Sequence, residues 1–215
     1  MQEKKQFQKN AQARKLKSKI DIAKSEKPVL SKEMQKKLND NLIETAKHDR
    51  IADIERLIKK GANIDAKDND ELTALMHAAR CGIIKTCKFL IEHKANINMR
   101  NRDGATALMH AALNGKTETC AFLLEHNADI KAKDNDGITM LMHAARCGSI
   151  ETCKFLIKHK ADIGAKSKDG KTASMWAIWH QHEETGEFLK MYPIRKIFGK
   201  ENVKVFLSIF SKCIA

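Results

Sequence analysis

The apolar positions of residues 73–93 have the spacing of two short helices joined by a turn, because they recur at i, i+3 and i+4. The first helix is predicted to follow Thr73, whose hydroxyl can cap it, and to end at Gly82. The apolar face of the second helix contains Ile84, Cys87, Leu90 and Ile91. A polar segment rich in Asp, Asn and Gly follows. The pattern therefore predicts a helix-turn-helix unit and then an extended, turn-rich connection.

This unit recurs every 33 residues. Residues 73–93 and 139–159 are identical at 17 of 21 positions, and a third copy lies between them. The threonines that open the units keep the step, as Thr73, Thr106, Thr139 and Thr172. A more degenerate copy precedes them. Since one such unit cannot bury its apolar face alone, we expect the copies to stack as a solenoid.

A 33-residue period that carries D-G-x-T-x-L-x-x-A-A, a glycine, a leucine pair and A-D/N-I resembles the ankyrin repeat. The resemblance covers residues 38–191. It implies a mainly α solenoid of helix-turn-helix units with short β-hairpin fingers, flanked by an N-terminal and a C-terminal helix. The expected copies are 38–68, 69–101, 102–134, 135–167 and 168–191.

Two departures from the family pattern change the expected local structure. In the family a proline usually follows the threonine, and a histidine comes two residues after that proline. Four copies here have methionine at the histidine position, namely Met76, Met109, Met142 and Met175. The glycine that usually ends the second helix is replaced by Lys94, Asn127 and Lys160. If these residues keep φ > 0, each lysine costs about 1 kcal/mol and the asparagine less.

The net charge of +13 is concentrated at the two ends. Residues 1–37 carry +8, residues 38–189 are neutral and residues 190–215 carry +5. Residues 1–37 are interpreted as a flexible, solvated extension. The basic cluster at 14–19 leaves a nucleic-acid or nuclear-targeting role open.

Helices are expected at both edges of the repeats. Ser31 can cap a helix over about 31–48 that extends the first copy. Residues 192–215 form the C-terminal segment, and within it residues 197–214 are amphipathic. Their apolar face contains Val203, Phe206, Leu207, Phe210 and Ile214. One interpretation is a cap over the last repeat; the other is a helix that binds a membrane surface or a partner.

No enzyme or cofactor is predicted. The chain has no nucleophile-elbow serine, phosphate-binding loop or zinc-protease motif. The histidines recur one per repeat, and helices stacked about 8–10 Å apart would hold them too far apart for one metal ion. Cys87, Cys120 and Cys153 are expected in the core, whereas Cys81 and Cys147 beside arginines are expected at the surface.

The resemblance implies that recognition uses the finger tips and the concave face of the first helices. It assigns partner binding in the fingers to Asn69, Leu72, Arg102, Ala105, Asn135, Ile138, Lys168 and Lys171. On the first helices it assigns partner binding to Arg80, Cys81, Leu113, Asn114, Arg146, Cys147, Trp179 and His180.

We therefore expect a monomeric adaptor that binds another protein, with a segment of acidic and apolar residues as the complement of this basic, aromatic surface. The alternative is a nucleic-acid- or membrane-associated protein localised by its basic ends. A polar start and six cysteines without metal or disulfide spacing suggest an intracellular, cytoplasmic protein; nuclear location or delivery into a host cell remains open.

Overall fold

The computed structural model describes residues 31–193. Backbone contacts divide the chain into two units, Met1–Lys36 and Lys37–Ala215. The repeats belong to the second unit. The amphipathic segment 197–214 and the basic cluster 14–19 lie outside the described residues, so the predictions made for them stay predictions.

The predicted helix pairs are present, and most of the helices are short. The first helices of successive copies are α2 (Lys32–Ala46), α4 (Ala74–Cys81), α6 (Ala107–Leu113), α8 (Met140–Arg146) and α10 (Ala173–Trp179). The second helices are α3 (Ile51–Lys59), α5 (Ile84–Glu92), α7 (Thr117–Glu125) and α9 (Ile150–Lys158), followed by a helix at 183–193. The prediction of a helix over about 31–48 is confirmed to within two residues, with the Ser31 hydroxyl accepting a hydrogen bond from the Met34 amide at 3.2 Å.

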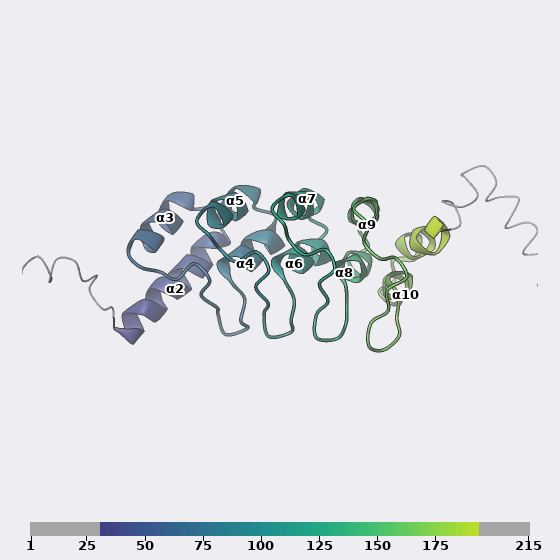
Figure 1. Cartoon of the computed structure of the whole chain (residues 1–215), viewed down its shortest axis with the longest axis horizontal. Coiled ribbons are helices and arrows are strands. Elements are labelled where there is room, and N and C mark those ends of the chain that lie inside the picture. Colours follow the sequence, from purple (N-terminus) through teal and green to yellow (C-terminus); the bar gives the residue numbers. More distant parts are fainter. Residues whose placement is uncertain (1–30, 194–215) are drawn as a thin grey trace, which may run out of the picture. The chain divides into compact units, whose positions relative to one another are not determined.

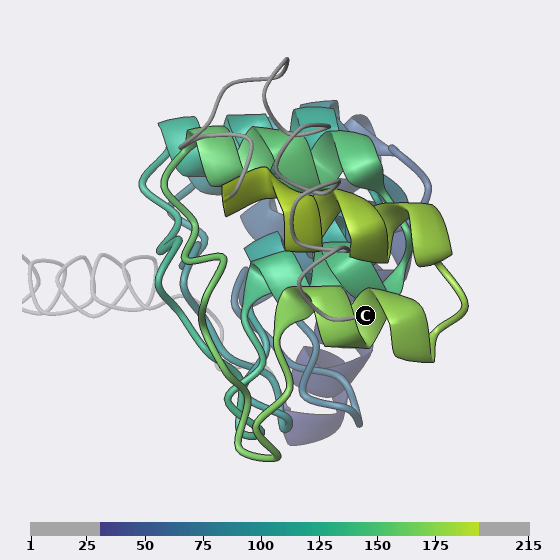
Figure 2. The ribbon, with the colours of Figure 1, turned by 90° about the vertical axis from the view of Figure 1, so that its right-hand side faces the viewer.

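First helices pack on first helices and second helices on second helices, so the repeats form two layers. The main contacts between copies join α4 to α6, α6 to α8 and α8 to α10. Figure 1 shows these layers, with the loops between repeats all extending from the side of the first helices. Viewed from the end in Figure 2, the helices and loops of successive repeats superimpose. The mainly α repeat solenoid is confirmed.

The core is made of small and aliphatic side chains. The alanine pairs 78–79, 111–112 and 144–145 are fully buried where successive first helices meet. One buried leucine and one buried cysteine line each of α5, α7 and α9, and the three cysteines are Cys87, Cys120 and Cys153. Burial raises the pKa of each of these three thiols to about 12, so they are unreactive core residues as predicted.

Buried threonines connect one repeat to the preceding one. The Thr86 hydroxyl donates to Asp49 at 2.8 Å, Thr152 shares a hydrogen bond with Thr117 at 2.7 Å, and Thr185 donates to the Gly148 carbonyl at 2.9 Å. These bonds satisfy hydroxyls that would otherwise be buried without partners. They also tie α5, α9 and the helix at 183–193 to the preceding copy.

The fingers are simpler than the expected β-hairpins. In residues 31–193 the only β pairings are single antiparallel bridges, Lys67 with Thr73 and Lys133 with Thr139. A side chain closes the turn together with the backbone bonds between Asp68 and Leu72 and between Glu71 and Asp68. The Asp68 carboxylate accepts the amides of Asp70 at 3.0 Å and Leu72 at 2.9 Å, which closes the turn locally.

The positive backbone angles expected where glycine is missing are confirmed. Lys94, Asn127 and Lys160 have φ of 71°, 67° and 68°, and Gln181 in the last copy has φ of 65°. Each ends its helix with a left-handed residue that strongly favours glycine. The stack therefore carries local strain at the end of several repeats.

Replacing Lys94 or Lys160 with glycine is expected to raise the free energy of unfolding by about 1 kcal/mol each, because the left-handed conformation no longer opposes a Cβ atom. Urea unfolding followed by circular dichroism measures this. The matched control is Lys88→Gly, inside helix α5, which should lower the free energy of unfolding by a similar amount. Equal destabilisation at all three positions would contradict the assignment of strain.

Candidate interaction surface

The last turns of α4, α6, α8 and α10 reach the surface, while the earlier turns of α4, α6 and α8 are buried. Arg80, Cys81, Asn114, Arg146 and Trp179 are exposed. Their half-buried neighbours at equivalent positions are Leu113, Cys147 and His180. We call these eight residues the helix-end stripe. The stripe consists of the same two neighbouring positions in four successive repeats. Because α4, α6, α8 and α10 stack on one another, these positions lie in a row.

The arginines of the helix-end stripe are available for a partner. Among the described residues, neither Arg80 nor Arg146 forms an ion pair with a carboxylate; Arg80 makes only a long contact of 3.5 Å to the ring of His77. In the preceding copy, by contrast, Lys47 is paired with Glu44 at 2.7 Å. The free positive charge of this surface therefore begins at the second repeat.

The aromatic end of the stripe lies on the last repeat. Trp179 is 61% exposed, and its ring is 5.2 Å from that of Trp176 and 5.7 Å from that of His180. The Lys171 ammonium lies 4.2 Å from the Trp179 centroid and is also paired with Asp169. A small degree of burial, with the charges of Arg146 and His182 added, lowers the pKa of His180. This end therefore combines an apolar surface with surrounding positive charge.

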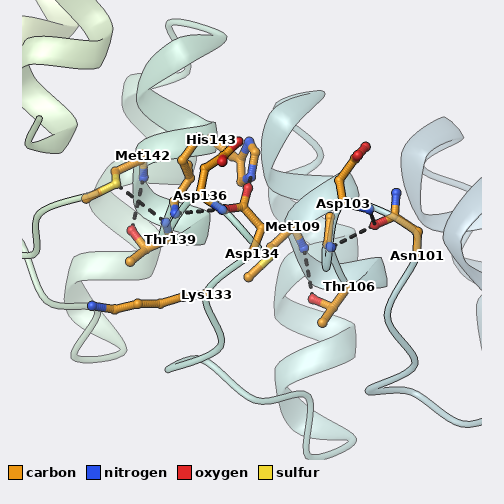
Figure 3. A network of polar contacts seen from close by, with 12 residues as sticks. Asn101, Asp103, Thr106, Met109, Lys133, Asp134, Asp136, Thr139, Met142 and His143 are labelled. Carbon is orange, nitrogen blue, oxygen red and sulfur yellow. Dashed lines mark hydrogen bonds and ion pairs between the residues drawn. The ribbon is translucent and has the colours of Figure 1, made fainter. Parts of the chain in front are cut away.

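A row of histidines lies beneath the stripe and supports the fingers. His77 Nε2 lies 2.7 Å from the Asp68 carboxylate, and His143 Nε2 lies 3.1 Å from that of Asp134. Figure 3 shows the second of these pairs beside the corresponding part of the preceding copy, where Asn101 occupies the position of the aspartate. The finger and the first helix of a copy are thus joined wherever the aspartate is present.

The middle copy lacks this support. Asn101 accepts the amides of Asp103 at 3.1 Å and Ala105 at 2.7 Å, and within the described residues His110 Nε2 is buried without a hydrogen-bond partner. Burial, with His143, Arg80 and His77 nearby, lowers the pKa of His110 to about 4. Burial also lowers the pKa of His77, although Asp68 opposes that effect. The ring of His110 is therefore neutral at pH 7.

The methionines that replace the usual histidine form part of the N-terminal cap of the first helix. The hydroxyls of Thr73 and Thr139 accept the amides of Met76 and Met142 at 3.3 and 3.4 Å. In return, the methionine sulfurs accept the threonine amides at 3.4 and 3.5 Å. Figure 3 shows this reciprocal pair at Thr139. The first helix is therefore still capped, with a weak sulfur acceptor.

The finger tips are connected to one another at steps of 33 residues. The Arg102 guanidinium donates to the Asn69 carbonyl, and the Asn135 amide side chain donates to the Arg102 carbonyl at 2.9 Å. Backbone bonds from Asn135 to Asp103 and from Lys168 to Asp136, at 2.8 and 2.9 Å, extend the connection. The finger residues Asn69, Arg102, Asn135 and Lys168 remain exposed, so these bonds order the tips while leaving surface for a partner.

Three residues assigned to partner contact lie in the core. Leu72 is 9% exposed, and Ala105 and Ile138 are each 7% exposed. They are placed inside because the carboxylate or amide that closes each turn binds their backbone amides and draws them against the first helix. Their burial leaves little of these three side chains for direct contact with a partner. They support the finger from within.

The two surface cysteines differ. Cys81 is exposed, as expected. Cys147 is half-buried because its thiol contacts the carbonyls of Ala112 and Ala144 at 3.4 and 3.2 Å. Across residues 31–193, no three side chains of His, Cys, Asp or Glu come together as metal ligands, and no helix is long and apolar enough to cross a membrane.

Sequence reasoning missed two sets of functional contacts. The aspartate–histidine pairs have a visible signal, since Asp68 and Asp134 each precede a histidine by nine residues. The bonds between fingers have a weaker signal, because Asn69, Arg102 and Asn135 share a position but not a residue type. Only stacking geometry shows that each side chain reaches the previous finger.

Helix pairs that stack on one another, with hydrogen bonds between successive fingers, define a helical repeat protein. The model of a family described as "Ankyrin repeats (3 copies)" matches residues 42–134 and 128–197, which together make up more than half of the chain. The chain therefore belongs to the ankyrin-repeat family. Members are typically non-enzymatic modules that bind other proteins. Comparison with curated proteins gave no match.

Acid is expected to destabilise the repeats through His110. Its folded pKa of about 4 lies below the unfolded value, so between pH 6.5 and pH 4 the unfolded chain binds more protons and stability falls as the pH falls. The loss from this residue is at most about 3 kcal/mol. Urea unfolding at a series of pH values should show a flatter slope for His110→Gln. The control His126→Gln, at an exposed histidine, should keep the wild-type slope; an unchanged slope in His110→Gln would contradict the account.

Proposed function

We propose that the protein is an intracellular adaptor that binds another protein through the helix-end stripe and the exposed finger tips. The observation that carries the proposal is the contrast within each first helix. In α4, α6 and α8 the inner positions are buried at equivalent sites, whereas the last turns of α4, α6, α8 and α10 expose arginine, cysteine, asparagine or tryptophan. A surface that repeats in position while varying in residue type suits a linear or folded partner that spans several repeats.

The chemistry of the stripe favours a partner segment with both acidic and apolar residues. Arg80 and Arg146 are two repeats apart, and each can form a bidentate pair with a carboxylate. Trp179 presents a large, rigid apolar surface beyond them. Arginine and tryptophan are the types most enriched among residues that dominate binding energy. We propose that carboxylates of the partner contact the arginines and that an apolar side chain contacts Trp179.

The bonded fingers support a preformed binding surface. Each exposed tip is connected to the next by a side-chain or backbone hydrogen bond, so little conformational freedom remains to be lost at the tips on binding. A partner that approached the stripe would meet the finger residues in a fixed order. The protein is proposed to act in this way as a monomer.

Arg80→Glu/Arg146→Glu in the full chain is expected to reduce partner capture from nuclease-treated cell lysate by at least about tenfold, because two like charges would face the partner's carboxylates. Trp179→Ala is expected to reduce capture by a comparable factor. The measurement is quantitative mass spectrometry of the captured proteins. The matched control is Lys85→Glu/Lys158→Glu, with the same change in net charge on exposed positions of second helices.

The control should retain the partner. Equal loss in both charge variants would show that general charge, and not the stripe, carries binding. Capture that disappears with nuclease, falls steeply with salt and requires residues 1–37 would instead support a nucleic-acid-associated protein.

A further inference from the structure

The last first helix exposes apolar side chains that are buried in every earlier copy. Met175 is 53% exposed, whereas its equivalents Met76, Met109 and Met142 are each 1% exposed. Ile178 is 50% exposed, whereas the alanines at its position, Ala79, Ala112 and Ala145, are fully buried. The earlier positions are covered because the next first helix packs against them. Helix α10 therefore presents a face built for a further helix.

The apolar residues on this face of α10 differ from those expected for a terminal repeat. A terminal repeat with no neighbour would be expected to carry polar residues at these two positions, since terminal repeats need a polar outer face. Ile178 is larger than the alanine it replaces, and it lies so close to Gly186 that a Cβ atom there would meet its Cγ1 at 2.6 Å. The isoleucine is thus seated against the helix at 183–193 while half of its side chain remains uncovered.

A further step of 33 residues reaches the amphipathic segment, although the threonine and the alanine pair of the repeat are replaced there by Val205 and by Phe210 and Ser211. Adding 33 to the bounds of α10 gives residues 206–212, within the amphipathic segment 197–214. In that register Leu207 takes the position of Leu75, Leu108 and Leu141, and Lys212 and Cys213 take those of Arg80 and Cys81. The apolar positions of this segment therefore coincide with the element that would follow α10.

The charges are also compatible. Residues 190–215 carry +5, and the helix at 183–193 exposes Glu183, Glu184 and Glu187. The 14 residues between α9 and α10 are enough to connect a second helix to the next first helix in the preceding repeat. Residues 194–205 provide a connection of comparable length.

We propose that residues 206–214 of the same chain dock as a helix on the exposed face of α10, forming a sixth half-repeat. Phe206, Leu207 and Phe210 cover Met175 and Ile178. The segment would then be part of the repeat stack. Lys212 would extend the basic helix-end stripe by one repeat. This inference concerns the end of the stack and does not depend on the proposed partner binding.

A double-mutant cycle in the full chain tests the docking. Phe210→Glu and Met175→Glu are each expected to lower the midpoint of thermal unfolding by about 5 °C, because each places a charge in the same apolar contact. The double variant should lower it by little more than either single variant, since one substitution already removes the contact. The matched control is Ser208→Glu, with the same charge change on the polar face, which should leave the midpoint within about 1 °C.

Three outcomes would overturn the proposal. Additive effects of the two substitutions would show that the residues do not share a contact. A midpoint that rises with protein concentration, with a dimer in sedimentation that Phe210→Glu dissociates, would assign the α10 face to a second copy. An unchanged midpoint in Phe210→Glu, together with lost binding to vesicles containing phosphatidylserine, would assign the segment to a membrane surface.

Discussion

Close approach of successive first helices sets the geometry of the whole stack. The buried alanine pairs, such as Ala111 and Ala112, allow α4, α6, α8 and α10 to approach one another closely. Because the spacing is the same at each step, a side chain in one finger reaches the same carbonyl in the previous finger, as Asn135 reaches Arg102. The order of the finger tips and the alignment of the exposed stripe both follow from this spacing.

The same spacing separates structural from binding roles within one short helix. Positions that face the neighbouring repeat become alanine, leucine or methionine, whereas the last turn is free to vary, as at Arg80 and Trp179. The histidines lie between these two zones. Where Asp68 or Asp134 is present the ring connects the helix to its finger, and where Asn101 replaces the aspartate the ring of His110 is left unpaired. The middle repeat, like the last one, where Trp176 Nε1 is also buried without a partner, lacks this bond between finger and helix.

The fold could be predicted from the sequence because its signals are local and repeated. Thr73 before an apolar block, Gly82 after it and the 33-residue step together predicted the helix pairs, and even the left-handed angles at Lys94 and Lys160 followed from the missing glycine. The surface was predicted less well, because the burial of a finger residue depends on the turn beneath it. Leu72 and Ile138 were assigned to the surface by position, but the turn closed by Asp68 or Asp134 directs them inward. Contacts that join residues 33 apart, such as Arg102 with Asn69, depend on the stacking distance and have no local signal.

The central claim is that the last turns of the first helices and the exposed finger tips bind a partner protein. Amide hydrogen exchange of the full chain, with and without a captured partner, tests it most directly. The account predicts slower exchange at the ends of α4, α6, α8 and α10 and at the finger positions 69, 102, 135 and 168, with unchanged exchange on the outer face of α5, α7 and α9. Protection confined to the second helices, or to residues before 38, would contradict it.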